Sequence, residues 1–330
     1  MTPASPHEPK SHRYAFLINP VSGSGIGRSV YDELPRVLEE LGLSEDHWTR
    51  EVTSNGRVVE QVKGLLESVD RLIVAGGDGT IGQALQGLRL SANSEAALGV
   101  IPLGTGNDLA RELNLLSVFA KRGLKPLVES LLQDQVAPLD LWQVGDSVVM
   151  ANYLSIGADG WVTETFASRR DLSESRHTIL GNKLRFAQAG FQCLSRRLPR
   201  DFEVRLTLSD GSILQRSLGG FRAFLAMNIG SYASGMLRPP KNRSDDGMLT
   251  VLAIPNLWNY LALALSGPSI RLHSFLQRRI PSWQVRSFEA TWTGANALQI
   301  DGEGRSDLLS HGRLSVTHMG RVRLLCGATR

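Results

Sequence analysis

Short apolar runs alternate with longer segments of helical periodicity along the first part of the chain. Buried strands are predicted at 14–18, 48–52, 71–75 and 97–101, and helices at 28–41, 57–69, 81–90 and 121–133. In the first of these helices the apolar residues recur near helical spacing, as expected for one face packed against a sheet. Strands that alternate with helices in this way predict a parallel, doubly wound sheet.

From residue 136 the pattern changes to short strand-like runs separated by turn signals. The predicted strands are 136–144, 148–155, 202–208, 212–218, 222–229, 249–254, 285–293, 297–301, 313–317 and 321–325. This pattern is typical of an antiparallel sandwich, here interrupted by helical inserts at 161–197 and 257–279. We therefore expect a disordered tail (1–13), an α/β nucleotide-binding domain (14–135) and an all-β, sandwich-like domain with helical inserts (136–330), whose last strand could return to the first domain.

Composition adds few constraints to this organisation. The 330 residues are 42% apolar and 21% charged, as in ordinary globular proteins, and the net charge of +4 permits an anionic partner. Cys193 and Cys326 have no ligand spacing and are expected to be reduced thiols. The longest apolar tract, 248–270, is interrupted by two prolines and two asparagines. It falls short of the ~20 apolar residues needed to span a bilayer, so we expect a soluble cytoplasmic protein, at most peripheral to a membrane.

Chemistry is concentrated in a glycine-rich turn, 76–80, that follows the third predicted strand with the sequence GGDGT. Its glycines let backbone N–H groups approach a phosphate, and the start of the next helix adds partial positive charge. A carboxylate at Asp78 would repel a phosphate unless a cation lies between them, which indicates Mg²⁺. The alternative is a plain glycine turn with Asp78 as the helix cap.

Two further turns rich in small residues follow the first and fourth predicted strands, at 19–25 and 102–107. Either could be a simple connector. Because the carboxyl ends of parallel strands meet at one edge of an open sheet, where ligands bind, the three turns together favour a site.

Two acidic turns lie in the second half of the chain. Asp301-Gly302-Glu303 ends a predicted strand, and it is either a hairpin turn or the source of a general base for a substrate hydroxyl. The turn at 243–248 contains two adjacent aspartates and is either a surface turn or a site for a hard cation.

Basic residues cluster beside aromatic ones in the predicted helical inserts. Residues 161–200 hold eight Lys or Arg against three acids, and 267–288 hold four Arg and no acid. This mixture suits an anionic membrane surface, although a solvated helix face or an RNA patch has the same composition. No nucleic-acid-binding signature is present, so we expect no nucleic-acid partner and a membrane lipid as substrate; a homodimer is left open.

The three turns, together with the 103–111 stretch LGTGNDLAR and the Asp246-Gly247 and Asp301-Gly302-Glu303 turns, resemble the diacylglycerol-kinase-type catalytic domain. That superfamily includes bacterial diacylglycerol kinases and the sphingosine and ceramide kinases. The resemblance covers nearly the whole chain from Tyr14. NAD kinases share the GGDGT turn, but LGTGNDLAR points to the lipid kinases.

The resemblance implies ATP and Mg²⁺ as cofactors and assigns residues to each. The implied ATP contacts are Asn19, Pro20, Val21, Ser22, Gly23, Thr53, Gly76, Gly77, Asp78, Gly79, Thr80, Ile81, Gly82, Gln83 and Thr105. Asp78 and Asp108 would act on Mg²⁺ and the phosphates, and the proton acceptor would be Glu303, with Asp301 second. A structural Mg²⁺ would be held by Asp246 and the carbonyls of Arg243 and Met248.

The sequence departs from the family at Ser24, where bacterial members often have lysine, and at Gly82-Gln83, where an asparagine–glutamate pair is usual. Arg28 or Arg111 would then supply the phosphate-neutralising charge. We expect an ATP- and Mg²⁺-dependent lipid kinase acting on diacylglycerol or a related glycerolipid. The alternatives are a kinase for NAD or another small molecule, and a nucleotide-binding regulatory protein without catalysis.

Overall fold

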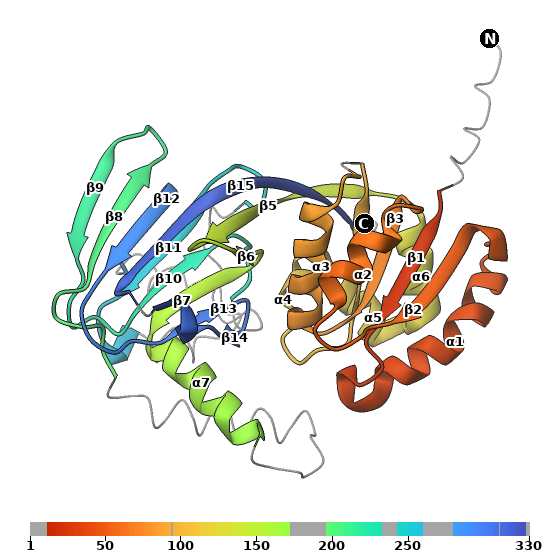
Figure 1. Ribbon diagram of the computed structural model, residues 1–330, viewed down its shortest axis with the longest axis horizontal. Coiled ribbons are helices and arrows are strands. Elements are labelled where there is room, and N and C mark those ends of the chain that lie inside the picture. The colour runs from red at the N-terminus through yellow and green to blue at the C-terminus, as the bar shows by residue number, and fades with distance from the viewer. Residues whose placement is uncertain are drawn as a thin grey trace.

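Two lobes lie side by side, joined by the long strands β5 (Val136–Val144) and β15 (Arg313–Leu325) (Figure 1). The computed structural model describes residues 12–93, 95–171, 196–232, 243–259, 280–309 and 311–327. The predicted tail, apart from its last two residues, and most of the two predicted helical inserts lie outside the described residues. Within the described part of the chain, no helix is long and apolar enough to cross a membrane.

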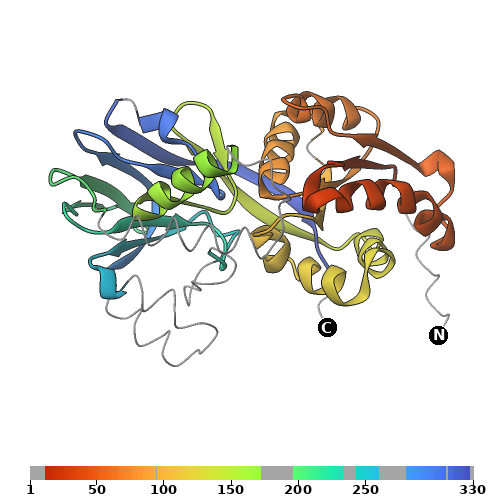
Figure 2. The ribbon, with the colours of Figure 1, turned by 90° about the horizontal axis from the view of Figure 1, so that it is seen from below.

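The N-terminal lobe is built on a parallel sheet, as the alternating pattern predicted. Its strands are β1 (Tyr14–Ile18), β2 (Trp48–Val52), β3 (Arg71–Gly76) and β4 (Ala97–Pro102), in the order β4-β3-β1-β2. Helices surround this sheet in Figure 2. They are α1 (Ile26–Glu40), α2 (Val58–Leu65), α3 (Asp78–Leu90), α4 (Asp108–Glu112), α5 (Leu115–Arg122) and α6 (Leu124–Leu132). The helix predicted at 121–133 is present as α6, but it begins at Leu124, because Gly123, with φ of 82°, separates it from the unpredicted helix α5.

The C-terminal lobe is antiparallel, and its strands follow the order β14-β13-β7-β10-β11-β12-β15. Besides β5 and β15 it contains β6 (Val148–Met150), β7 (Tyr153–Gly157), β8 (Glu203–Leu208), β9 (Ile213–Ser217), β10 (Ala223–Met227), β11 (Leu249–Ile254), β12 (Ser282–Thr291), β13 (Leu298–Ile300) and β14 (Glu303–Gly304). The helix α7 (Ala158–Asp171) follows β7 directly. The expected class, an α/β lobe followed by a strand-rich lobe with helices, is confirmed.

Strand β15 differs from its prediction. Residues 313–317 and 321–325 were expected to be separate strands around a turn at Met319-Gly320, but they form one strand. The pairing with β5 shifts register between His318 and Gly320, so the supposed turn is a bulge, with Gly320 at φ of 111°. The end of β15 pairs in parallel with β4, and the sheet therefore continues from one lobe into the other.

Alternate residues of β10 face two different apolar clusters. Phe224 and Ala226 belong to the main core of the C-terminal lobe, with Trp142 and Phe288. The residues of the opposite face form a separate buried cluster: Tyr153, Ala223, Leu225, Met227, Tyr232, Leu252, Ile254 and Ile280. Apolar residues on both faces show that this part of the sheet is covered on both sides.

Candidate active site

The three glycine turns meet at the carboxyl ends of β1, β3 and β4. The N–H of Asn19 donates to the Ala75 carbonyl at 2.8 Å, and the N–H of Leu103 donates to the Gly76 carbonyl at 2.9 Å. A Cβ added at Gly104 would lie 2.7 Å from the Cα of Gly77, so these two turns touch backbone to backbone. Only glycine permits this approach, and the N–H of Gly104 itself donates to Asn107 Oδ1 at 2.9 Å.

The first turn is tied to the second by Asn19. Its side-chain nitrogen donates to Thr80 Oγ1 at 3.0 Å, and its side-chain oxygen accepts from the N–H of Val21 at 3.2 Å. Thr53 is brought to the same edge, because its N–H donates to the Ile18 carbonyl at the end of β1. Gly82, in contrast, has open space around it.

Asp78 begins α3 and reaches toward the third turn. Its Oδ2 accepts a hydrogen bond from the N–H of Asn107 at 2.9 Å, and a Cβ added at Gly106 would lie 2.7 Å from the same oxygen. Burial raises the pKa of Asp78 to about 6, the charge of Asp108 adds to the rise, and the N–H of Asn107 opposes it. The alternative of Asp78 as the helix cap is wrong, since Gly77 is the N-cap and no side chain caps α3.

Asp108 links the two lobes. It is only 2% exposed, and it accepts hydrogen bonds at 2.9 Å from the hydroxyls of Tyr153 on β7 and of Ser231. Arg111 lies 3.9 Å away on the same short helix. A carboxylate of the N-terminal lobe is thus fixed by two hydroxyls of the C-terminal lobe.

Asp301 is a structural anchor of its hairpin. Its carboxylate accepts three backbone hydrogen bonds of 2.8–2.9 Å, from the N–H groups of Ala151, Asn152 and Tyr153. Burial raises the pKa of Asp301 to about 6 despite these donors, and the charge of Asp78 contributes to the rise. Because both of its oxygens are occupied, Asp301 is poorly placed to accept a proton from a substrate.

Glu303 is exposed and crosses between the lobes. It lies in β14, two residues after Asp301, and a Cβ added at Gly79 would overlap with its Oε1. The carboxylate therefore rests on the first turn of α3, next to Asp78. The structure brings the four predicted catalytic carboxylates, Asp78, Asp108, Asp301 and Glu303, to one junction between the lobes.

The acidic turn at 243–248 is separate from this junction and adjoins β5 and β15. Asp246 accepts the N–H of Met248 at 3.0 Å, and Asp245 pairs with the guanidinium of Arg243. Buried Asp140 accepts from the N–H of Gly247 at 2.6 Å and pairs with Arg321 and His318. Burial raises the pKa of Asp246, and the charges of Asp140 and Asp245 add to it.

The donor chemistry of this turn suits a hard cation, but the set is sparse. Among the described residues, no group of three or more His, Cys, Asp or Glu is arranged to hold a metal ion. The set implied for a structural Mg²⁺ has one carboxylate, Asp246, and two backbone carbonyls, so water would have to complete it.

Comparison with known proteins decides the family. The model of the diacylglycerol kinase catalytic domain matches residues 13–144, and that of the diacylglycerol kinase accessory domain matches residues 149–304. The chain belongs to the diacylglycerol-kinase-type lipid kinase superfamily. The two matches divide it near the start of β6, so the catalytic-domain model includes the whole of β5.

Individual relatives cover different shares of this family member. Diacylglycerol kinase of Bacillus subtilis is 27% identical over 297 residues, which are 88% of this chain and 89% of the relative. Human diacylglycerol kinase iota is 28% identical over 266 residues, 71% of this chain, and the chain spans about a quarter (24%) of its length. A crystal structure of a diacylglycerol kinase from Bacillus anthracis has a TM-score of 0.67 at 19% identity and covers 96% of this chain and 97% of its own, which shows the fold.

Sequence reasoning missed several residues of this kinase-family site. Tyr153 and Ser231 hold Asp108, and nothing in their sequence context distinguishes them from ordinary strand and turn residues. Asn107, which holds Asp78, lies in the LGTGNDLAR stretch but was not assigned a role. Their roles depend on contacts between segments that are distant along the chain.

The two cations suggested in place of a lysine at Ser24 are distinguished by the structure. Arg28 is directed away from the turns and pairs with Asp32 on α1 at 3.2 Å. Arg111 lies beside Asp108, its Nη2 is 3.4 Å from the Gly106 carbonyl, and its buried Nε has no hydrogen-bond partner. Arg111 is therefore the better candidate for a phosphate ligand.

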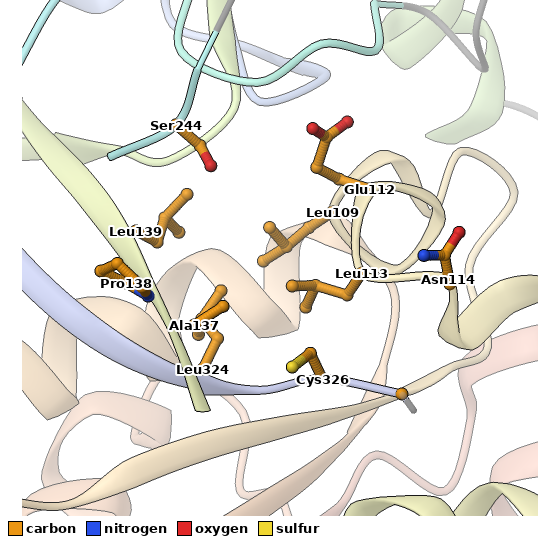
Figure 3. A pocket seen from close by; sticks show the side chains of 11 residues that line it. Leu109, Glu112, Leu113, Asn114, Ala137, Pro138, Leu139, Ser244, Leu324 and Cys326 are labelled. Atoms are coloured by element: carbon orange, nitrogen blue, oxygen red, sulfur yellow. The ribbon is translucent and has the colours of Figure 1, made fainter. Parts of the chain in front are cut away.

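A cavity of about 220 Å³ lies between α4, β5 and the end of β15, and Figure 3 shows the side chains that line it. Its wall is mostly apolar, with Leu109 from α4, Leu113 just after that helix, and Leu139 from β5. None of the predicted site residues lines this cavity, so it is distinct from the carboxylate junction.

Proposed function

We propose that this chain is an ATP- and Mg²⁺-dependent kinase that transfers the γ-phosphoryl group to a lipid hydroxyl, with diacylglycerol as the substrate and phosphatidic acid as the product. The observation that carries the proposal is the position of Glu303, whose carboxylate meets the first turn of α3 opposite the glycine turns. A base from one lobe thus faces a phosphate cradle of the other. The family membership and the names of the relatives support the choice of lipid.

The nucleotide would bind along the glycine turns, with its phosphates at their N–H groups and at the start of α3. Asp78 and Asp108 are the residues that would hold Mg²⁺, which neutralises phosphate charge when bound. The raised pKa of Asp78 fits this role, because a bound cation would favour its ionised form. Arg111 would add a fixed positive charge on the same side.

In the reaction, Glu303 would accept the proton of the lipid hydroxyl as its oxygen forms a bond to the γ-phosphorus. The bond from that phosphorus to the bridging oxygen breaks, and ADP leaves. Asp301 would act by holding the hairpin that carries Glu303, through its three backbone hydrogen bonds. Asp246 and the carbonyls of Arg243 and Met248 would hold a structural Mg²⁺.

Labelled ATP and a panel of lipids in mixed micelles test this function. With diacylglycerol and Mg²⁺ we expect labelled phosphatidic acid. We expect none with Asp78→Ala, provided that circular dichroism shows that the variant is folded. Labelling of NAD or another soluble acceptor in place of lipid would contradict the proposal. So would tight ATP binding with no transfer to any lipid.

A further inference from the structure

An aromatic and basic patch, with Trp161 half-buried and Trp258 exposed, lies at the end of the C-terminal sheet opposite the four carboxylates. In the strand register Gly157 pairs with Ala223, and Ala223 pairs with Ile254, so the end of β7, the start of β10 and the end of β11 share one edge (Figure 1). Trp161 follows on the first turns of α7, and Trp258 follows β11 and is 80% exposed. Trp258 is the most exposed large apolar side chain of the described residues.

Two arginines complete this patch. Arg196 is exposed and its guanidinium lies over the ring of Trp161, 4.4 Å from the ring centroid. Arg197 is exposed beside it and donates to the Gly220 carbonyl at 3.0 Å. Arg222 connects the segment that carries Arg196 with the end of β11. Its guanidinium donates to the Arg196 carbonyl, and its backbone N–H donates to the Ile254 carbonyl. Burial and the charge of Arg197 lower the pKa of Arg222, as expected where positive charge is crowded.

We propose that this Trp–Arg patch, formed by Trp161, Arg196, Arg197 and Trp258, is the surface that docks on a bilayer containing anionic phospholipid. Tryptophan prefers the interface between water and hydrocarbon, and each arginine near an anionic surface adds attraction. The inference rests on the proposed function in one respect: docking there would bring the lipid substrate to the active site.

The strand geometry connects the patch with the carboxylates. β7 runs from Tyr153, which bonds Asp108, to Gly157 at the patch, and four residues of strand span about 13 Å. One leaflet of hydrocarbon is about 15 Å thick. If the patch rests on the membrane, a lipid must move about 13 Å out of the bilayer to reach the carboxylates. Because its acyl chains are about as long as one leaflet is thick, their ends would still lie near the bilayer surface. The separate apolar cluster around Leu225 and Met227 lies along the same stretch of sheet.

Vesicle sedimentation in the absence of ATP tests the patch independently of catalysis. The wild-type chain should sediment with phosphatidylcholine vesicles that contain phosphatidylglycerol and much less with phosphatidylcholine alone. Removing both charges in Arg196→Gln/Arg197→Gln should weaken binding about thirtyfold, and Trp258→Ala roughly tenfold. The control, Arg205→Gln/Arg216→Gln, removes two exposed arginines from the β8–β9 hairpin and should bind as wild type.

Activity separates the docking surface from the site. Patch variants should keep wild-type turnover on a dispersed short-chain diacylglycerol and lose turnover on vesicle-embedded substrate. Equal loss of vesicle binding in the control pair would overturn the inference, as would full competition by an RNA oligonucleotide at the same sites. If the wild-type chain phosphorylates micellar lipid but binds no vesicle, the docking surface is refuted and the function stands. Patch-dependent vesicle binding without any lipid phosphorylation would refute the function alone.

Discussion

Replacing Asp78 with asparagine should stabilise the folded chain while abolishing phosphoryl transfer. The pKa of Asp78 rises from 3.8 to about 6 on folding, chiefly through burial. Its ionised form is thus disfavoured in the folded state, so the stabilising contribution is present in full below the unfolded pKa. That contribution is lost as the pH rises through about 6. At pH 7 Asp78 is ionised, and the folded state bears the full free-energy cost of burying its charge.

The size of the effect follows from the shift. A change of about two pKa units corresponds to about 3 kcal/mol. Asp78 is partly exposed, which reduces the cost, and asparagine retains an oxygen for the N–H of Asn107. We therefore expect Asp78→Asn to raise the free energy of unfolding by about 1–3 kcal/mol at pH 7 and by roughly half as much at pH 5, which lies between the unfolded pKa of 3.8 and the folded pKa of about 6.

Urea unfolding of both proteins without nucleotide or metal, at pH 7 and pH 5, measures this difference. Asp201→Asn is the control, because the pKa of Asp201 is lowered by its hydrogen bond with Thr293, and this variant should gain no stability. A variant at Asp78 that is no more stable than wild type at pH 7 would refute the reasoning. An equal gain at the two pH values would refute it as well, since the gain must depend on ionisation.

Three further substitutions probe the contacts between the lobes. Gly79→Ala should lower turnover sharply because its Cβ would overlap with Glu303 Oε1. Gly82→Ala in the same helix has open space in the ligand-free chain, leaves Glu303 in place and should gain about 0.5–1 kcal/mol in denaturant unfolding. Glu303→Gln should reduce kcat by about 10²–10⁴-fold without loss of stability, because the side chain is exposed; near-normal kcat would exclude it as the base. Arg111→Ala should weaken ATP binding measured by calorimetry, whereas Arg28→Ala should not; equal effects would remove the assignment of Arg111.

The sequence was sufficient to predict that the three glycine-rich turns meet at one edge, because parallel strands end at the same side of their sheet. It also predicted the hairpin of Asp301 and Glu303. It could not distinguish the two acids. Asp301 became an anchor only through N–H groups of residues 151–153, about 150 positions away, and Glu303 became the accessible acid by the same folding.

Local signals were misleading where tertiary pairing decided the structure. Met319-Gly320 has the residues of a turn, and a bulge in a long strand uses the same left-handed glycine. The choice depends on β5, which pairs with β15 on both sides of the bulge. The helix predicted to start at residue 121 starts at Leu124 instead, because Gly123, with φ of 82°, ends one helix before the next begins.

The path of β15 explains how carboxylates from both lobes come to one place. This strand pairs with β12 and β5 in the C-terminal lobe and with β4 in the N-terminal lobe. Two paired strands therefore hold the lobes together, in place of a flexible linker. The hydroxyl bridge from Tyr153 and Ser231 to Asp108 then fixes their spacing at the site. If Glu303 is the base and the glycine turns bind phosphate, as proposed, groups held in this way need little further ordering when substrates bind, which is the entropic part of a catalytic advantage.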